Sequence, residues 1–170
     1  GNWKLNLDHL QSIAFVQKLA WVLKDARVDF RTVEVAVFPP FTDLRSVQSL
    51  IAADDFPITT GAQDISAHDS GAYTGEVSGA FLKALDCRYA IVGHSERRRD
   101  FGETDERIGQ KLGRATDARL RAILCVGERA EERDAGQAEA VVESQLRGAL
   151  AAHDPAALAA AGLVVAYEPV

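Results

Sequence analysis

The chain has few cysteines, no excess of basic residues and no long apolar run. Its apolar segments are short and interrupted, whereas a membrane-spanning helix needs about 20 consecutive apolar residues, so we predict no membrane span. Lys and Arg number 19 against 25 Asp and Glu, a net charge of −6. This balance disfavours nucleic acid and anionic membranes as partners, because both select basic surfaces. A small anionic substrate is still compatible, since one lysine and a few backbone N–H groups can hold a phosphate.

The two cysteines, Cys87 and Cys125, lack the spacing of a disulfide framework or a metal site. Both lie in or beside apolar strand-like runs, so we expect reduced core thiols in a cytoplasmic protein. No signal peptide is expected at the start of the chain. The histidines also lack metal-ligand spacing, so no metal site is predicted. They are His9, His68, His94 and His153.

Apolar runs of four to eight residues alternate with longer amphipathic stretches. This alternation predicts a single α/β domain over residues 1–170, with a parallel sheet covered by helices. The strands are near-continuous Val, Ile and Ala runs, which predicts burial of both sheet faces. Helices are predicted over residues 8–25, 43–53, 79–85, 103–118 and 137–152. Strands are predicted over residues 33–38, 58–62, 89–92, 122–126 and 163–167. Residues typical of helix starts support this pattern: Asp8, Thr42–Asp43, Ser78 and Thr104–Asp105.

Residues 62–80, AQDISAHDSGAYTGEVSGA, form one long irregular segment. It is too polar for a core and too long for a routine connection. Loops of this length tend to be functional. We therefore interpret the segment as a binding surface for a partner subunit or a substrate.

Polar side chains follow several of the predicted strands. In parallel β/α folds the active site gathers at the carboxyl ends of the strands. Each residue alone has an ordinary structural explanation, such as a hydrogen-bonded histidine or a salt-bridged glutamate. Together they place a cation, an imidazole and carboxylates on one rim. The candidates are Asn2, Lys4, His94, Ser95, Glu96 and Glu168.

A carboxylate beside an imidazole, without a nucleophile motif, suits proton abstraction next to a carbonyl. At the start of a helical turn the helix dipole disfavours the imidazolium form, so we expect His94 to be neutral and to polarise the carbonyl. Lys4 would offset the negative charge of an anionic substrate or enolate. Ser95 is not expected to be a nucleophile, because no GxSxG elbow surrounds it.

Two arginines, Arg97 and Arg98, follow Glu96 directly. We interpret them as structural ion-pair partners, with Glu103 as the expected carboxylate.

Five fragments occur in a characteristic order: GNWKLN, GAQDISAHDSGAYTGEVSG, VGHSERR, ILCVGE and AYEPV. In order and separation they resemble the triosephosphate isomerase family, of the bacterial type, from the first residue to the last. That family is a TIM (β/α)8 barrel of about 250 residues. The resemblance implies that the chain holds roughly the first six β/α units, with the start of the first strand absent.

The resemblance also implies a reaction. It is the interconversion of dihydroxyacetone phosphate and D-glyceraldehyde 3-phosphate in glycolysis and gluconeogenesis, through an enediolate and without a cofactor. Glu168 matches the general base, and His94 matches the neutral electrophile. Ser95 and Glu96 match a supporting shell around these two groups.

The remaining matches concern substrate binding and assembly. Asn2 and Lys4 match substrate-contacting residues, with Lys4 as the electrostatic anchor. The segment 62–80, around Thr74, is similar to the loop that inserts into a second subunit near Asn2 and Lys4. A homodimer is therefore implied.

The resemblance implies that the lid, the last two strands and the phosphate-gripping backbone of the family lie beyond the last residue given. Without a lid, water reaches the enediolate. We therefore expect the 170 residues alone to be inactive. Two alternatives stay open: a catalytically inactive partial barrel that persists by association with another chain, and a different phosphate-handling barrel enzyme.

Overall fold

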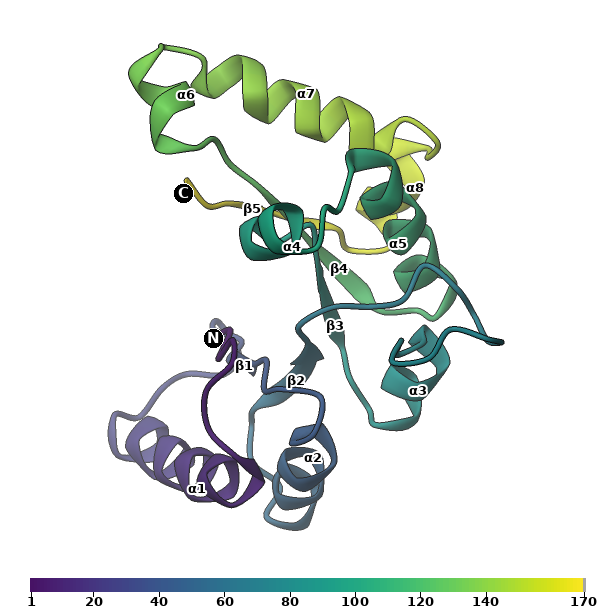
Figure 1. Cartoon of the computed structure of the whole chain (residues 1–170). Coiled ribbons are helices and arrows are strands. Elements are labelled where there is room, and N and C mark those ends of the chain that lie inside the picture. The colour runs from purple at the N-terminus through teal and green to yellow at the C-terminus, as the bar shows by residue number, and fades with distance from the viewer. Residues whose placement is uncertain (170) are drawn as a thin grey trace. The chain divides into compact units, whose positions relative to one another are not determined.

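The computed structural model describes residues 1–169, so Val170, the last residue of the AYEPV motif, lies outside the described residues. One or more helices separate each pair of successive strands along the chain (Figure 1). The helices are α1 (His9–Asp25), α2 (Leu44–Ala53), α3 (Gly79–Ala84), α4 (Ser95–Asp100), α5 (Asp105–Asp117), α6 (Ala130–Asp134), α7 (Ala138–Leu150) and α8 (Pro155–Ala160). The strands are β1 (Ala36–Val37), β2 (Thr59–Ala62), β3 (Tyr89–Val92), β4 (Arg121–Val126) and β5 (Val164–Tyr167).

The five predicted helices and five predicted strands are confirmed, with two differences. The strand predicted over residues 33–38 is only the two-residue β1, because the backbone N–H of Val33 donates to the carbonyl of Asp29 in a turn at 3.1 Å. Helices α4, α6 and α8 were not predicted as separate elements. They have six, five and six residues, too few to show an amphipathic repeat.

The chain forms two compact units. Unit 1 comprises Gly1–Gln63 and Leu82–Tyr89. Unit 2 comprises Asp64–Phe81 and the chain from Ala90 onward. The sequence-based prediction of a single domain stays a prediction.

In unit 1, β1 and β2 pair in parallel, with Ala36 opposite Thr59. Asn2 forms an isolated parallel bridge with Phe38, which continues the parallel pairing on the other side of β1. Helices α1 and α2 lie side by side in unit 1 (Figure 1). Apolar side chains from both helices and from the strand region form its core: Val16, Ala20, Val37, Val47 and Ile58.

Helix α1 begins where the sequence predicts. The Asp8 carboxylate accepts the backbone N–H groups of Leu10 and Gln11, and the Gln11 side chain accepts the N–H of Asp8. This reciprocal capping box satisfies donors that the first helical turn leaves free. Asp43, at the start of α2, makes no such cap. Its carboxylate instead accepts the buried Ser12 hydroxyl of α1 at 2.9 Å, which ties the two helices together.

In unit 2 the strands neighbour one another in chain order, β3, β4 and β5. β4 and β5 are parallel, with Cys125 opposite Ala166 and Val126 opposite Tyr167. β3 is buried throughout, as predicted from its apolar sequence. The prediction that both faces are buried is wrong for β5. Val165 and Tyr167 are about half exposed, because within residues 1–169 β5 has β4 as its sheet neighbour and no strand on its other side.

Helices α5 and α7 pack closely in unit 2. Thr104 caps α5 by accepting the N–H of Arg107, as its sequence position predicts. Two glycines allow the close approach. A Cβ on Gly109 would lie 2.8 Å from the carbonyl oxygen of Ala149, and a Cβ on Gly148 would lie 2.6 Å from Cβ of Asp105. The parallel strands with intervening helices confirm the predicted α/β class. In the described part of the chain, each helix is too short or too polar to cross a membrane.

Candidate active site

His94 lies at the point where β3 ends and α4 begins. Gly93 has φ +71°, a left-handed conformation that glycine adopts without strain and that turns the chain out of the strand. His94 is then the N-cap residue of α4 and is only 5% exposed. Its Nδ1 accepts the backbone N–H of Glu96 at 3.3 Å. A neutral imidazole with Nδ1 as acceptor carries its proton on Nε2, so this contact assigns the tautomer.

Glu168 lies directly after β5. Its backbone N–H donates to the carbonyl of Val126 at 2.8 Å, so the pairing with β4 continues one residue past the strand. One carboxylate oxygen, Oε2, lies 3.2 Å from Nε2 of His94. The Glu168 side chain is 42% exposed. The structure therefore brings together a carboxylate that solvent can reach and the protonated nitrogen of a buried imidazole.

The other two residues of the GHSE motif flank this pair. Ser95 is the first residue of α4 and is partly buried. The Oε2 atom of Glu96 lies 3.5 Å from Nδ1 of His94, on the opposite edge of the ring from Glu168. The imidazole thus lies between two carboxylates, and the Glu96 backbone N–H keeps Nδ1 occupied as an acceptor.

Asn2 and Lys4 belong to unit 1. The Asn2 side-chain oxygen accepts the backbone N–H of Lys4 at 3.0 Å, and Lys4 has φ +55°. The Gln63 side-chain amide donates to the carbonyl oxygens of Lys4 and Phe38 at 2.9 and 2.8 Å, which fastens this exposed turn. The structure therefore brings Asn2 and Lys4 together in unit 1, and groups the remaining candidates in unit 2: His94, Ser95, Glu96 and Glu168.

A buried ion network connects α4 with α5. The Lys111 ammonium, on a side chain 3% exposed, contacts both Asp64 oxygens at 2.6 and 2.9 Å and also contacts Glu103. Arg97 pairs with Glu103 at 2.6 Å and with Asp64 at 3.0 Å. The predicted pair of Arg97 with Glu103 is therefore confirmed. Arg98 pairs instead with Asp105 at 2.6 Å, because its side chain points toward the start of α5.

Burial affects the two carboxylates of this network differently. Burial raises the pKa of Asp64 above its ordinary value, against the opposing effect of the Lys111 and Arg97 charges. Burial also acts to raise the pKa of Glu103. There the hydrogen bonds from Lys111 and Arg97 outweigh burial and hold the pKa below its ordinary value.

Glu128 is a buried carboxylate whose surroundings the sequence did not reveal. Its side chain is fully buried, and its Oε1 accepts the Tyr167 hydroxyl at 2.9 Å and the Arg133 guanidinium at 2.7 Å. Its own backbone N–H lowers the pKa of Glu128, and the bonds from Arg133 and Tyr167 lower it further against the effect of burial. The contact fixes the residue that precedes Glu168. The available signal was a carboxylate two residues after the end of β4.

The segment predicted as a binding loop is fastened to α5 within unit 2. Arg107 of α5 directs both terminal guanidinium nitrogens to Nε2 of His68 at 3.3 Å. The His68 ring stacks on Tyr73 with centroids 3.6 Å apart and planes 4° apart. Arg114 of α5 pairs with Asp69. The loop is therefore attached to one helix at two ion or hydrogen-bond contacts.

The middle of this loop is exposed, including Thr74. The expectation that the segment is too polar for a core is wrong at its beginning, where Asp64, Ile65 and Ser66 are buried. The reason is the pairing of Asp64 with Lys111, which lets a charged residue enter the interior.

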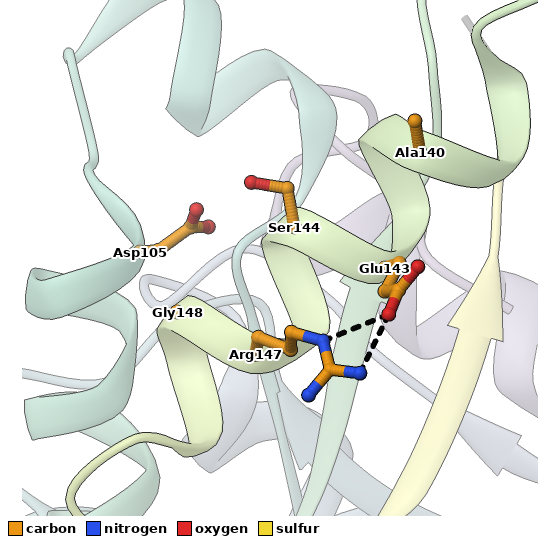
Figure 2. A pocket seen from close by; sticks show the side chains of 6 residues that line it. All are labelled: Asp105, Ala140, Glu143, Ser144, Arg147 and Gly148. Atoms are coloured by element: carbon orange, nitrogen blue, oxygen red, sulfur yellow. Dashed lines mark hydrogen bonds and ion pairs between the residues drawn. The ribbon is translucent and has the colours of Figure 1, made fainter.

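A groove of unit 2 lies between the start of α5 and helix α7 (Figure 2). On its α7 side, Glu143 and Arg147 pair on successive turns of the helix at 2.6 Å. Within residues 1–169, no three His, Cys, Asp or Glu side chains are arranged to hold a metal ion. The groove is lined by Asp105, Ala140, Glu143, Ser144, Arg147 and Gly148.

Comparison with known proteins gives consistent matches. Residues 1–170 match the family described as triosephosphate isomerase. Over 170 residues the chain is 62% identical to the triosephosphate isomerase of Leifsonia xyli subsp. xyli and 54% identical to that of Streptomyces coelicolor. It is 52% identical to that of Mycobacterium tuberculosis. All of this chain is covered, and it spans 64% of the length of these curated relatives. Because the family match extends over the whole sequence, the chain belongs to the triosephosphate isomerase family, a family of TIM (β/α)8 barrels.

Proposed function

We propose that this chain carries the base and the electrophile of an enzyme that interconverts dihydroxyacetone phosphate and D-glyceraldehyde 3-phosphate, in glycolysis and gluconeogenesis. The observation that supports this most directly is the 3.2 Å approach of Glu168 Oε2 to His94 Nε2, in a chain of the triosephosphate isomerase family. The reaction needs no cofactor, because it moves protons within a single molecule.

The proposed roles follow from the two side chains. The Glu168 carboxylate removes a proton from C1 of dihydroxyacetone phosphate, while His94 Nε2–H donates to the carbonyl oxygen on C2. The electron pair of the broken C–H bond forms the C1–C2 double bond of the enediolate. Transfer of protons between the two oxygens, and return of the proton from Glu168 to C2, gives the aldehyde. In the structure Nε2–H faces Glu168, and the substrate oxygen takes over this donor.

His94 suits the role of a neutral electrophile. Its Nδ1 accepts from Glu96, so the ring presents a donor only at Nε2. We assign Lys4 as the cationic anchor for the phosphate and the enediolate, Asn2 as a substrate contact, and Ser95 as a supporting residue.

We further propose that the protein acts in the cytoplasm as a homodimer. The buried, free cysteines Cys87 and Cys125 suit a compartment that keeps thiols reduced. The exposed part of segment 62–80, with Thr74 at its centre, would supply the dimer surface, and light scattering tests the assembly. The net charge of −6 argues against nucleic acid or anionic membranes as partners.

Two substitutions test the roles of the site residues. Glu168→Asp withdraws the carboxylate, and His94→Gln replaces the imidazole by an amide, which can donate a hydrogen bond but cannot transfer its proton. Each should lower kcat by about 10²- to 10⁴-fold, as expected for loss of a positioned acid or base, with little change in melting temperature. A coupled assay with dihydroxyacetone phosphate and glyceraldehyde 3-phosphate measures this, with the protein expressed at the full length of its curated relatives, of which the chain spans 64%.

Matched controls are Glu131→Asp and His9→Gln, which make the same chemical changes at exposed positions. Both should turn over substrate at the unmodified rate. Near-normal turnover of Glu168→Asp or His94→Gln would contradict the assignment. A chain that shows no turnover and self-associates would favour the inactive partial barrel instead.

A further inference from the structure

We propose that Arg98 is a positioning residue that sets the orientation of the His94 imidazole toward Glu168, beyond its ion pair with Asp105. This inference deepens the proposed function and rests on it for its catalytic consequence. Its structural part concerns His94 geometry alone and is measured without any turnover.

Arg98 holds both peptide groups that flank His94. Its side-chain Nε donates to the carbonyl of Gly93, the peptide before His94, at 2.8 Å. Its backbone N–H donates to the carbonyl of His94 itself, the peptide after it, at 3.1 Å. The direction of a side chain from its Cα follows from the two peptide planes on either side of that Cα. The guanidinium thus restrains the peptide plane before His94, while the backbone N–H groups of residues 97 and 98 hold the plane after it.

The same guanidinium also reaches β4. Its Nη2 lies 3.4 Å from the carbonyl oxygen of Cys125. The next residue, Val126, accepts the backbone N–H of Glu168. Arg98 therefore links the turn that carries His94 to β4, and β4 in turn holds the backbone of Glu168, whose carboxylate lies 3.2 Å from His94.

The guanidinium is itself held in place. The Arg98 side chain is 17% exposed, and its Nη1 donates to Asp105 Oδ1 at 2.6 Å. Asp105 opens α5 and lies against Gly148 of α7, where a Cβ would come within 2.6 Å of the Asp105 Cβ (Figure 2). Gly93 completes the arrangement, since a Cβ there would lie 3.2 Å from Arg98 Nη2. The packing leaves the guanidinium little freedom to move.

A lysine cannot reproduce this arrangement. Arg98 uses three nitrogens of a planar fork for three acceptors in different directions, namely the carbonyls of Gly93 and Cys125 and the carboxylate of Asp105. Lysine carries one ammonium, a point charge on a flexible stem. Arg98→Lys therefore keeps the charge and loses the geometry, which separates positioning from electrostatics.

The test follows the ring nitrogens of His94 by ¹⁵N NMR in the unmodified chain and in Arg98→Lys. In the unmodified chain Nδ1 should give the signal of an unprotonated nitrogen and Nε2 that of a protonated one, because Nδ1 accepts from Glu96. In Arg98→Lys the two signals should move toward each other as the tautomers mix. The proposed isomerase activity should fall by roughly 10- to 100-fold in kcat with KM unchanged, the effect of a misdirected group.

Arg97→Lys is the matched control, because Arg97 neighbours Arg98 on α4 and its side chain pairs with Asp64 and Glu103. It should lower the melting temperature and leave the His94 signals in place. A purely structural Arg98 would behave in the same way, and that result would overturn the inference.

If Arg98→Lys fails to fold, the same NMR measurement on Asp105→Asn tests the inference. Asn keeps the size of the side chain beside Gly148 and removes the charge that anchors Arg98, so the His94 signals should shift in the same direction by less. Unchanged signals would overturn the inference. If the His94 signals shift as expected but no form of the chain isomerises triose phosphates, the positioning role stands and the proposed function fails.

Discussion

Replacing Lys111 by methionine tests the buried network most directly. The network holds two cations and two anions, and methionine keeps the volume of the lysine stem while it removes one cation. Asp64 would then lose contacts at 2.6 and 2.9 Å, and Glu103 would lose its second cationic partner. Removing one member of a buried ion pair costs about 3–5 kcal/mol. A domain typically has about 5–15 kcal/mol of stability in total. Lys111→Met should therefore reduce the urea midpoint strongly.

The pH dependence gives this prediction its sign. In the unmodified chain the pKa of Glu103 is lowered, so its contribution to stability is present above the unfolded pKa and is lost as pH falls through the folded pKa. The pKa of Asp64 is raised, so its contribution to stability is present below the unfolded pKa and is lost as pH rises through the folded pKa. Without Lys111 both folded pKa values lie higher. The stability difference between variant and unmodified chain should then shrink from neutral pH to about pH 4.3, the ordinary glutamate pKa.

Urea unfolding followed by circular dichroism at both pH values measures this. Arg147→Met, which breaks an exposed pair with Glu143, is the control and should cost only about 0.3–0.5 kcal/mol. In the double variant Lys111→Met with Glu103→Gln one positive and one negative charge remain, so part of the loss should be recovered. A loss below about 1 kcal/mol that does not change with pH would refute the reasoning, since it is the size expected of an exposed pair.

Two further outcomes are expected. Gly127→Ala places a methyl group 2.0 Å from the Glu168 carbonyl oxygen, so it should displace Glu168 and lower kcat by about 10²-fold. Gly113→Ala is the control and should leave kcat unchanged, because its methyl group would meet only His153 Cε1, at 3.3 Å. Burial raises the pKa of Cys87 to about 11, and burial together with the nearby Glu168 charge raises the pKa of Cys125 to about 12. Both thiols should therefore resist a disulfide reagent at about pH 8 and react only in denaturant; rapid reaction of the folded chain would contradict this.

The sequence predicted the elements better than the contacts between them. Strand β3 follows from an uninterrupted apolar run, and α1 follows from Asp8 before an amphipathic stretch. The short β1 could not be predicted, because a turn near Val33 competes with the sheet for the same apolar residues. Short helices such as α6 leave no repeat to read.

The candidate site shows the same division. The positions of His94 and Glu168 after their strands were readable, because parallel strands bring their carboxyl ends to one edge. The role inferred for Arg98 could not be predicted from the sequence. Two of its partners are backbone carbonyls, and every residue has a backbone carbonyl, so no residue type signals the contact. The burial of Glu128 was equally hidden, since it depends on the distant Tyr167 hydroxyl.

The attachment of the 62–80 segment to α5 has a thermodynamic consequence. Its irregular chain would ordinarily sample many conformations, and binding of a partner would then cost the conformational entropy of ordering it. Here Arg107 contacts His68 and Arg114 pairs with Asp69. The Tyr73 ring stacks on His68, which restrains the loop residues between these two. Part of that conformational entropy is therefore lost when the chain folds. A partner docking on the exposed tip meets a surface already ordered, so more of the contact energy is available as affinity.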